Sequence, residues 1–310
     1  MNTYSIIVPV FKSNESLFVL SEQISDMQVQ LACTFELILV NDSPWYTETC
    51  NALSEIEKMY PFVKVVTLWK NQGQQIALLT GLLFATGKYC ITMDDDLQHP
   101  VSEISKLIRS MDEHPQIDAI FACPPYHQKK HSHWRNLASA TMNKIDTFFL
   151  KKPKGLNKSA FRIMRKELAI KLTNNYNAMP SVSSLIIYHT HRLMNIEVDH
   201  SPRQFGKSNY TLRKMISLAL NDLIHYSSLP LKVLGAVGFA GFLFSVIFIL
   251  ITLIRKLFFG IAFPGYASIV TLISFFGGLN LLAIGIIGEY LIRIIKEQQK
   301  PSLSDLVRPK

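Results

Sequence analysis

The sequence predicts an α/β fold with a mostly parallel sheet, followed by an apolar helical hairpin near the C-terminus. Two observations predict it. Apolar, β-branched runs alternate with helix-spaced apolar segments in the first third of the chain, and two long uncharged stretches follow residue 230. The chain has 310 residues, of which 48% are hydrophobic and 18% charged. Because the apolar excess lies in those last stretches, we expect a globular part followed by a membrane part.

Four short apolar runs are predicted to be buried strands, each followed by a segment with helical spacing. The strands are expected at residues 4–10, 35–40, 63–68 and 89–93, and the helices at residues 15–30, 47–59, 75–85 and 100–111. Gly87 ends the third helix and Pro100 opens the fourth. Ligands bind at the carboxyl ends of such strands, where Asp42 follows the second strand and Asp94 to Asp96 follow the fourth.

The two uncharged stretches, Val233–Ile254 and Tyr266–Gly288, are each long enough to cross a bilayer. Lysines and arginines flank the pair on both outer sides, whereas only Arg255 and Lys256 lie between the spans, so both termini are expected in the cytoplasm. Residues 211–229 resemble an amphipathic helix on the membrane surface. The expected domains are a globular domain (1–209), a juxtamembrane helix (210–230), the hairpin (231–290) and a cytoplasmic tail (291–310).

The net charge of +9 predicts an acidic partner: nucleic acid, an anionic membrane surface or a phosphorylated substrate. The apolar spans favour the membrane and the phosphate, and no nucleic-acid-binding signature is present. The four cysteines lack zinc spacing, so free thiols in a reducing cytoplasm are expected.

The segment MDDDLQHP (Met93–Pro100) follows a predicted buried strand and carries the most specific signal in the chain. Carboxylates two residues apart can reach one divalent cation, and oxygen ligands suit Mg²⁺ or Mn²⁺. A diphosphate leaving group needs such a cation to neutralise its developing charge. An acidic turn that caps the next helix is the alternative, and the position after a buried strand favours the metal.

These residues also carry a family resemblance. The runs VPVFKSNESL, VNDS and NQGQQIALLTGLLFATGKYCITMDDDLQHP resemble the family 2 glycosyltransferases of GT-A fold. They resemble most the polyprenyl-phosphate branch, which includes dolichol-phosphate mannosyltransferase and bacterial undecaprenyl-phosphate sugar transferases. The ending IGEYLIRIIKEQQKP (Ile287–Pro301) is similar to the family's ending, so the resemblance covers nearly the whole chain.

The resemblance implies roles for three groups of residues. Nucleotide-binding residues are implied at Pro9, Val10, Glu15, Asp42, Asn71, Gly73 and Asp94. Asp94 and Asp96 are implied as catalytic residues, and Asp96 and Gln98 as ligands of Mg²⁺ or Mn²⁺. Phosphate or acceptor contacts are implied at Arg203, Gly206, Lys207, Ser208, Arg213 and Lys214, although a solvated basic linker is the alternative there.

The chain departs from the family pattern in two places. Many members carry an aspartate shortly before the Phe161–Arg162 pair, where this chain has Asn157 and Ser159. A phosphate acceptor is already largely anionic at neutral pH and needs no base, so this absence is compatible with activity. Where relatives often have a Gly-Ser-Arg segment, Lys129, Lys130 and Arg135 are the residues expected to supply the positive charge.

The sequence therefore predicts a bacterial inner-membrane enzyme that moves a sugar, with inversion, from a nucleotide-sugar to a polyprenyl phosphate. A UDP-linked donor and undecaprenyl or dolichyl phosphate are the first expectations. A non-catalytic membrane scaffold and a processive polysaccharide synthase remain as alternatives; the synthase's Gln-x-x-Arg-Trp motif is absent. Relatives form homo-oligomers, and the glycines of the spans would permit close helix contacts.

Overall fold

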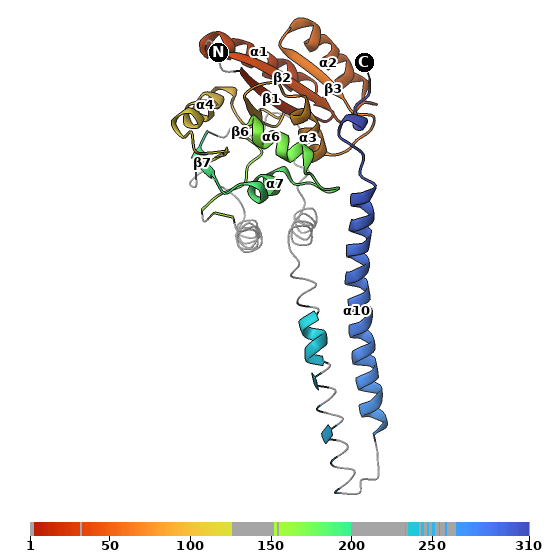
Figure 1. The fold of residues 1–310 in the computed structure, drawn as a ribbon. Coiled ribbons are helices and arrows are strands. Elements are labelled where there is room, and N and C mark those ends of the chain that lie inside the picture. The colour runs from red at the N-terminus through yellow and green to blue at the C-terminus, as the bar shows by residue number, and fades with distance from the viewer. Residues whose placement is uncertain are drawn as a thin grey trace. The chain divides into compact units, whose positions relative to one another are not determined.

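The computed structural model describes residues 3–31, 33–125, 152–153, 155–199 and 265–309, with scattered positions between residues 233 and 258. The chain forms two compact units, Met1–Ser217 with Lys300–Lys310, and Leu218–Gln299. The first unit contains the sheet and the second contains a long apolar helix (Figure 1).

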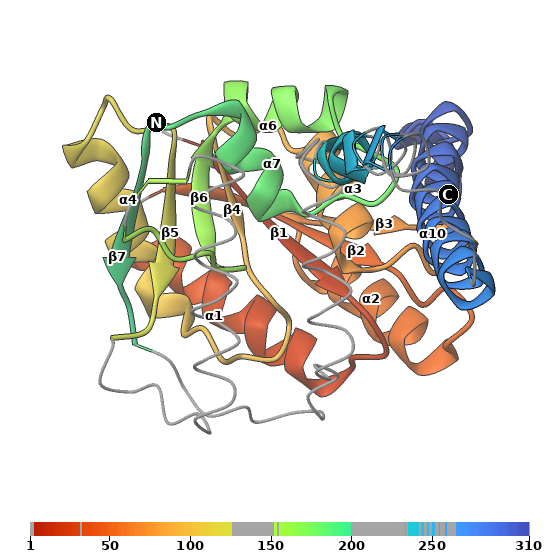
Figure 2. The ribbon, with the colours of Figure 1, turned by 90° about the horizontal axis from the view of Figure 1, so that it is seen from below.

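Seven strands form one sheet in the order β3-β2-β1-β4-β6-β5-β7 (Figure 2). The strands are β1 (Thr3–Val10), β2 (Thr34–Asn41), β3 (Val63–Thr67), β4 (Tyr89–Thr92), β5 (Ala119–Cys123), β6 (Arg162–Arg165) and β7 (Leu193–Glu197). Only β6 runs against its neighbours, β4 and β5. The predicted mostly parallel sheet is confirmed, and β5, β6 and β7 are additions that the sequence did not predict.

Helices cover both faces of the sheet (Figure 2). One face carries α1 (Glu15–Leu31), α2 (Thr47–Met59) and α4 (Ile104–Glu113), which follows a short 3-10 turn η1 (Val101–Glu103). The other carries α3 (Gln74–Phe84), α6 (Lys166–Asn174) and α7 (Val182–His189). Every residue of β1 from Tyr4 to Val10 is buried, as expected for a strand covered on both faces. The four predicted helices are confirmed to within a few residues at their ends.

The register of the parallel strands brings their carboxyl ends to one edge of the sheet. Val10 of β1 is paired with Asn41 of β2, which is paired with Thr67 of β3. On the other side of β1, Ile7 is paired with Thr92, the last residue of β4. The segments after these four strands therefore all begin at this edge, where the predicted polar motifs lie.

In the second unit, α10 (Tyr266–Gln298) includes the second predicted span and is about 50 Å long at 1.5 Å per residue. It is the one helix among the described residues that is long and apolar enough to cross a membrane. Its apolar side chains Ile273, Phe275 and Ile284 are more than half exposed. The first predicted span, 233–254, falls partly outside the described residues, although residues 235–241 are helical. The two-span hairpin therefore stays a prediction.

Candidate active site

Asp42, directly after β2, is a buried carboxylate that fixes the segment leading into α3. Its Oδ1 accepts the Gln72 N–H at 2.6 Å, and its Oδ2 accepts the Gly73 N–H at 2.9 Å. The Asn71 side-chain amide also donates to Oδ2, at 3.1 Å. Burial raises the pKa of Asp42, and the two backbone N–H groups oppose that rise because they favour the anion. The loop at residues 69–73, which we call the donor loop, is thus held by one carboxylate.

Gly73 gives the donor loop its shape. It caps the N-terminus of α3 with φ +87° and ψ 154°, a conformation that essentially only glycine adopts. The next residue, Gln74, donates its side-chain amide to Oδ1 of Asp94 at 2.7 Å. The start of α3 is therefore bonded to Asp42 on one side and to the acidic turn after β4 on the other.

The loop after β1 joins the same edge. Pro9 and Val10 are buried at the end of β1, and Glu15 is exposed at the start of α1. The Lys12 N–H donates to Oγ of Ser43, the residue after Asp42, at 3.0 Å. The structure therefore brings these loops together at one edge, while the binding roles of their residues stay predictions.

The three consecutive aspartates point to different partners. Asp94 accepts from Gln74, the Asp95 carboxylate accepts the Ser13 hydroxyl, and Oδ1 of the buried Asp96 accepts the Gln98 N–H at 3.1 Å. Leu97, with φ +56°, turns the chain between Asp96 and Gln98. Ser13 and Gln74 were not predicted as site residues, although both lie in the runs that carry the family resemblance.

The acidic turn concentrates negative charge in a partly buried place. Burial, and then the charges of Asp96 and Asp95, raise the pKa of Asp94 to about 6. Burial also raises the pKa of Asp95 to about 6, against the lowering effect of the Ser13 hydrogen bond. Carboxylates that are costly to ionise together indicate a place where a bound cation would be stabilised.

The side chains fit a cation that is shared with a substrate. Among the described residues, no group of three or more His, Cys, Asp or Glu side chains is placed to hold a metal alone. Mg²⁺ is typically held by one or two carboxylates together with substrate phosphates, so a complete protein cage is not required. Asp96 and Asp94 would supply such carboxylates, and Gln98, whose backbone N–H is bonded to Asp96, follows in the same turn.

Arg162, at the start of β6, lies behind the acidic turn and is 1% exposed. Its Nε donates to Oγ1 of Thr92 at 2.9 Å, and its Nη1 donates to Oγ of Ser183 at 2.7 Å. Burial lowers the pKa of this guanidinium to about 10, and the charge of Asp94 opposes that shift. Arg162 was not predicted as a site residue. The signal available in the sequence was the Phe161–Arg162 pair, which matches a pair in the family pattern.

The segment that lacks the family aspartate contains a lysine in a defined position. Nζ of Lys158 donates to Oγ of Ser184 in the first turn of α7, at 2.9 Å. The same end of α7 is bonded to α3, because Oε1 of Gln75 accepts the Val182 N–H at 2.8 Å. The segment in which many family members have an aspartate thus carries the positive charge of Lys158, which is bonded to the Ser184 hydroxyl.

The predicted phosphate and acceptor residues lie outside the described residues and stay predictions. They are Lys129, Lys130, Arg135, Arg203, Gly206, Lys207, Ser208, Arg213 and Lys214. The predicted juxtamembrane helix at residues 210–230 also lies outside them.

Comparison with known proteins agrees with this geometry. A family model described as "Glycosyl transferase family 2" matches residues 5–173. The undecaprenyl-phosphate 4-deoxy-4-formamido-L-arabinose transferase of Proteus mirabilis is 29% identical over 96% of this chain and 90% of its own length. An uncharacterised glycosyltransferase of Synechocystis sp. is 28% identical over 94% of this chain and 91% of its own length.

Solved structures share the fold at low sequence identity. Mannosyl-3-phosphoglycerate synthase from Rubrobacter xylanophilus has a TM-score of 0.53 at 10% identity, over 76% of this chain and 75% of that chain. Glucosyl-3-phosphoglycerate synthase from Mycobacterium tuberculosis, in complex with Mn²⁺, UDP-glucose and phosphoglyceric acid, has a TM-score of 0.50 at 15% identity, over 73% and 79%. The predicted GT-A fold is confirmed by these likenesses.

Proposed function

Because the chain belongs to glycosyl transferase family 2, we propose that it transfers a sugar from a nucleotide-sugar to a polyprenyl phosphate at a membrane surface. The observation that carries the proposal is the acidic turn Asp94–Asp96, joined through Gln74 to the loop that Asp42 holds. The Proteus mirabilis relative is an undecaprenyl-phosphate sugar transferase by name and matches this chain nearly end to end. Undecaprenyl phosphate is therefore the first acceptor to test, with a UDP-sugar as donor.

The donor would lie along the carboxyl edge of β1, β2 and β4. The nucleoside would lie against Pro9, Val10 and the donor loop, with its diphosphate near Asp94 and Asp96. When bound there, Mg²⁺ or Mn²⁺ would neutralise the charge that develops on the leaving diphosphate. Arg162 lies behind the turn, and its buried charge offsets part of the carboxylate charge when the site is empty.

The proposed reaction is one displacement. An oxygen of the acceptor phosphate forms a bond to the anomeric carbon, while the bond from that carbon to the diphosphate oxygen breaks. The nucleoside diphosphate leaves with the electron pair, and the sugar inverts its configuration. The phosphate carries no proton that must be removed, so the absence of a carboxylate at Asn157–Ser159 does not prevent the step. Lys158 and the predicted cations Arg203 and Lys207 would attract the acceptor phosphate.

The membrane requirement would be met by the apolar C-terminal helix. A polyprenyl phosphate keeps its tail in the bilayer and its phosphate at headgroup level, so an enzyme that uses it must act at the membrane surface. The length and composition of α10 support attachment to a membrane. We propose two spans, with the globular domain and both termini in the cytoplasm of a bacterial inner membrane.

The experiment is sugar transfer to undecaprenyl phosphate in detergent micelles, with a panel of labelled nucleotide-sugars and Mn²⁺. At least one donor should yield a lipid-linked product with the wild-type protein. Asp96→Ala should lower the rate by about 100-fold or more, because carboxylate and metal support of the leaving group is lost.

Asp112→Asn, an exposed aspartate of α4, is the matched control and should transfer sugar at the wild-type rate. Undiminished transfer by Asp96→Ala would overturn the assignment of the turn. Binding of nucleotide-sugar without transfer to any polyprenyl phosphate would instead favour the non-catalytic scaffold.

A further inference from the structure

The last ten described residues, Lys300–Pro309, belong to the globular unit although they follow the apolar helix α10 in the chain. We call them the tail. Lys300 donates from Nζ to the carbonyl of Tyr176, and the Tyr176 hydroxyl donates to the carbonyl of Pro301. Leu303 and Leu306 are 3% and 8% exposed. The tail is therefore packed against the globular domain along its length.

The tail pairs with the chain just after β3, which is the edge strand of the sheet. Leu68 and Val307 form an antiparallel bridge. The Arg308 N–H donates to the Thr67 carbonyl at 2.8 Å, and the Trp69 N–H donates to the Leu306 carbonyl at 3.0 Å. These backbone bonds satisfy groups that an edge strand otherwise leaves open.

The bridge lies directly before the donor loop. Trp69 is bonded to the tail, and only Lys70 and Asn71 separate it from the two backbone amides that Asp42 holds. The Leu68 N–H is also bonded to the carbonyl of Asn41, the residue before Asp42, at 3.0 Å. The loop is thus fixed at its start by the tail and at its end by Asp42.

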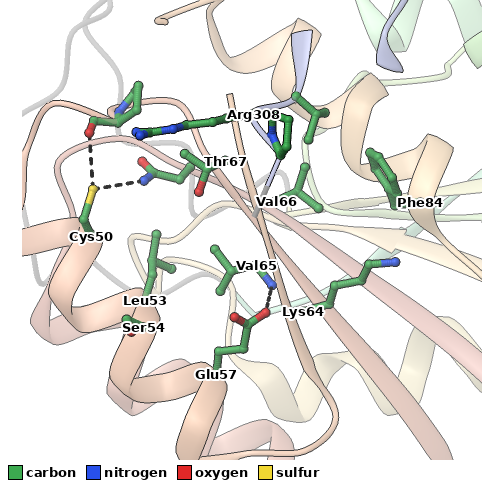
Figure 3. Close-up of a pocket in the computed structure, with 14 residues that line it drawn as sticks. Cys50, Leu53, Ser54, Glu57, Lys64, Val65, Val66, Thr67, Phe84 and Arg308 are labelled. Atoms are coloured by element: carbon green, nitrogen blue, oxygen red, sulfur yellow. Dashed lines mark hydrogen bonds between the residues drawn. The ribbon is translucent and has the colours of Figure 1, made fainter. Parts of the chain in front are cut away.

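The tail also walls a cavity of about 490 Å³ between α2, β3 and the end of β2 (Figure 3). Cys50 and Glu57 of α2 line it opposite the strand residues Val65 and Thr67, and Arg308 lines it from the tail. Oε1 of Glu57 accepts the N–H of Val65 on the open edge of β3, at 2.8 Å. Together with the bond from Leu68 to Asn41, the tail bridge restrains the chain that enters the donor loop.

We propose that the tail is a positioning element for nucleotide binding, acting through the Leu68–Val307 bridge on the donor loop. The proposal rests on the proposed function in assigning that loop to the nucleotide. By this proposal, nucleotide binding depends on the residues that follow the apolar helix α10. Loss of the bridge should loosen the amides of Gln72 and Gly73, which Asp42 must hold in place for the nucleotide.

Arg308→Pro tests the bridge with little other change. It removes the N–H that bonds Thr67, and Val307 already has the extended conformation (φ −90°, ψ 129°) that precedes proline readily. Arg308→Ala is the matched control, because it keeps that N–H and removes the side chain beyond Cβ, whose guanidinium carbon lies 5.9 Å from the centre of the Trp69 ring. A chain that ends after Asp305 is a second variant; it removes both backbone bonds and the buried Leu306, so its effect should be at least as large as that of Arg308→Pro.

The measurement is hydrogen–deuterium exchange of the intact protein in detergent micelles without substrate. In Arg308→Pro the amides of Gln72 and Gly73 should exchange about fivefold to tenfold faster, as expected for one lost backbone bond, and in Arg308→Ala they should not. Unchanged exchange at these two amides in Arg308→Pro and in the shortened chain would overturn the proposal. Equal acceleration in Arg308→Ala would also overturn it, since the effect would then belong to the side chain.

UDP affinity in the presence of Mn²⁺ gives the functional readout. It should fall several-fold in Arg308→Pro and stay at the wild-type value in Arg308→Ala, by the same loosening of the loop. If the wild-type protein binds no UDP, the proposed nucleotide is wrong, whereas the exchange result still decides whether the tail positions the loop.

Discussion

The two halves of the sheet build their parts of the site in different ways. In the parallel half, β3-β2-β1-β4, short motifs at the strand ends bond to one another, as Asp42 does to Gln72 and Gly73. In the mixed half, β6-β5-β7, single charged side chains contribute, and their hydrogen-bond partners lie far away in the sequence. Arg162, for example, is bonded to Thr92 and Ser183. The parallel half holds the loops that we propose to bind the substrate, and the mixed half places the buried charge of Arg162 next to Asp94.

This difference predicts which substitutions unfold the domain and which only impair binding. In the parallel half, Asp94, Asp95 and Gln98 are half-buried, and a substrate or metal would complete their interactions. The Arg162 guanidinium of the mixed half is fully buried and is bonded within the protein. Its loss should therefore act on stability first.

Arg162→Met gives the largest expected effect. Removing a buried, hydrogen-bonded charge beside Asp94 should cost about 3–5 kcal/mol, which lowers the Tm of a domain this size by roughly 10 °C. Adding Asp94→Asn should recover part of the loss, because no buried charge is then left uncompensated. Thermal unfolding of the purified variants in micelles measures both effects.

Arg165→Met is the control on the same strand. Its Nε and Nη2 donate to the carbonyls of Ile117 and Pro115, in a less buried place. We expect a loss of about 1–2 kcal/mol. Equal Tm values for Arg162→Met and Arg165→Met would break the distinction drawn between the two halves.

The pH dependence of stability is the next effect in size. The pKa values of Asp94 and Asp95 are about 6 in the folded chain, against an ordinary 3.8. The folded chain therefore binds protons at these carboxylates more tightly than the unfolded chain does. The stability that this provides is complete below about pH 4 and is lost as the pH rises through about 6. Partial exposure screens the effect, so a Tm change of a few degrees is expected.

The measurement compares wild type with Asp94→Asn/Asp95→Asn in metal-free buffer. Above about pH 6 the double variant should have the higher Tm, and the difference should shrink toward about pH 4. Mn²⁺ with UDP should raise the Tm of the wild type alone. A difference that is constant with pH would contradict the charge concentration assigned to the turn.

Two glycines provide the most closely matched comparison. Gly73 precedes α3 in the parallel half, and Gly155 lies before the mixed half; their φ values are +87° and +80°, with no atom within 4 Å of an added Cβ. Gly73→Ala and Gly155→Ala should each cost about 1–3 kcal/mol through backbone strain alone. Only Gly73→Ala should weaken UDP binding, and equal weakening by both would show that the donor loop has no special part in it.

The sequence predicted the parallel half because its signals are local. Four apolar runs indicated β1 to β4, and MDDDLQHP placed the acidic turn after the fourth. The strand β6 was missed because RIMR is four residues long and begins with a buried arginine, which no periodicity distinguishes from a loop. Asp42 was predicted to bind the nucleotide. Its bonds to the donor loop could not be predicted, because they join residues 30 and 31 positions apart.

The tail illustrates the same limit. Residues 291–310 were expected to form a simple cytoplasmic tail, since nothing in SLSDLVRPK suggests pairing with β3. The bridge between Leu68 and Val307 depends on an edge strand that exists only in the folded sheet. Local sequence patterns therefore predicted where the candidate site residues lie. The contacts that hold the donor loop in place join residues distant in sequence and were not predicted.

We propose that the carboxylates after β4 hold a cation together with a sugar-bearing diphosphate. Electron paramagnetic resonance of Mn²⁺ tests it directly, because free and bound Mn²⁺ give different spectra. The wild-type protein should bind one Mn²⁺ per chain tightly only when UDP is present, and Asp96→Asn should weaken that binding by about tenfold or more. Equal UDP-dependent Mn²⁺ binding by wild type and Asp96→Asn would contradict the account.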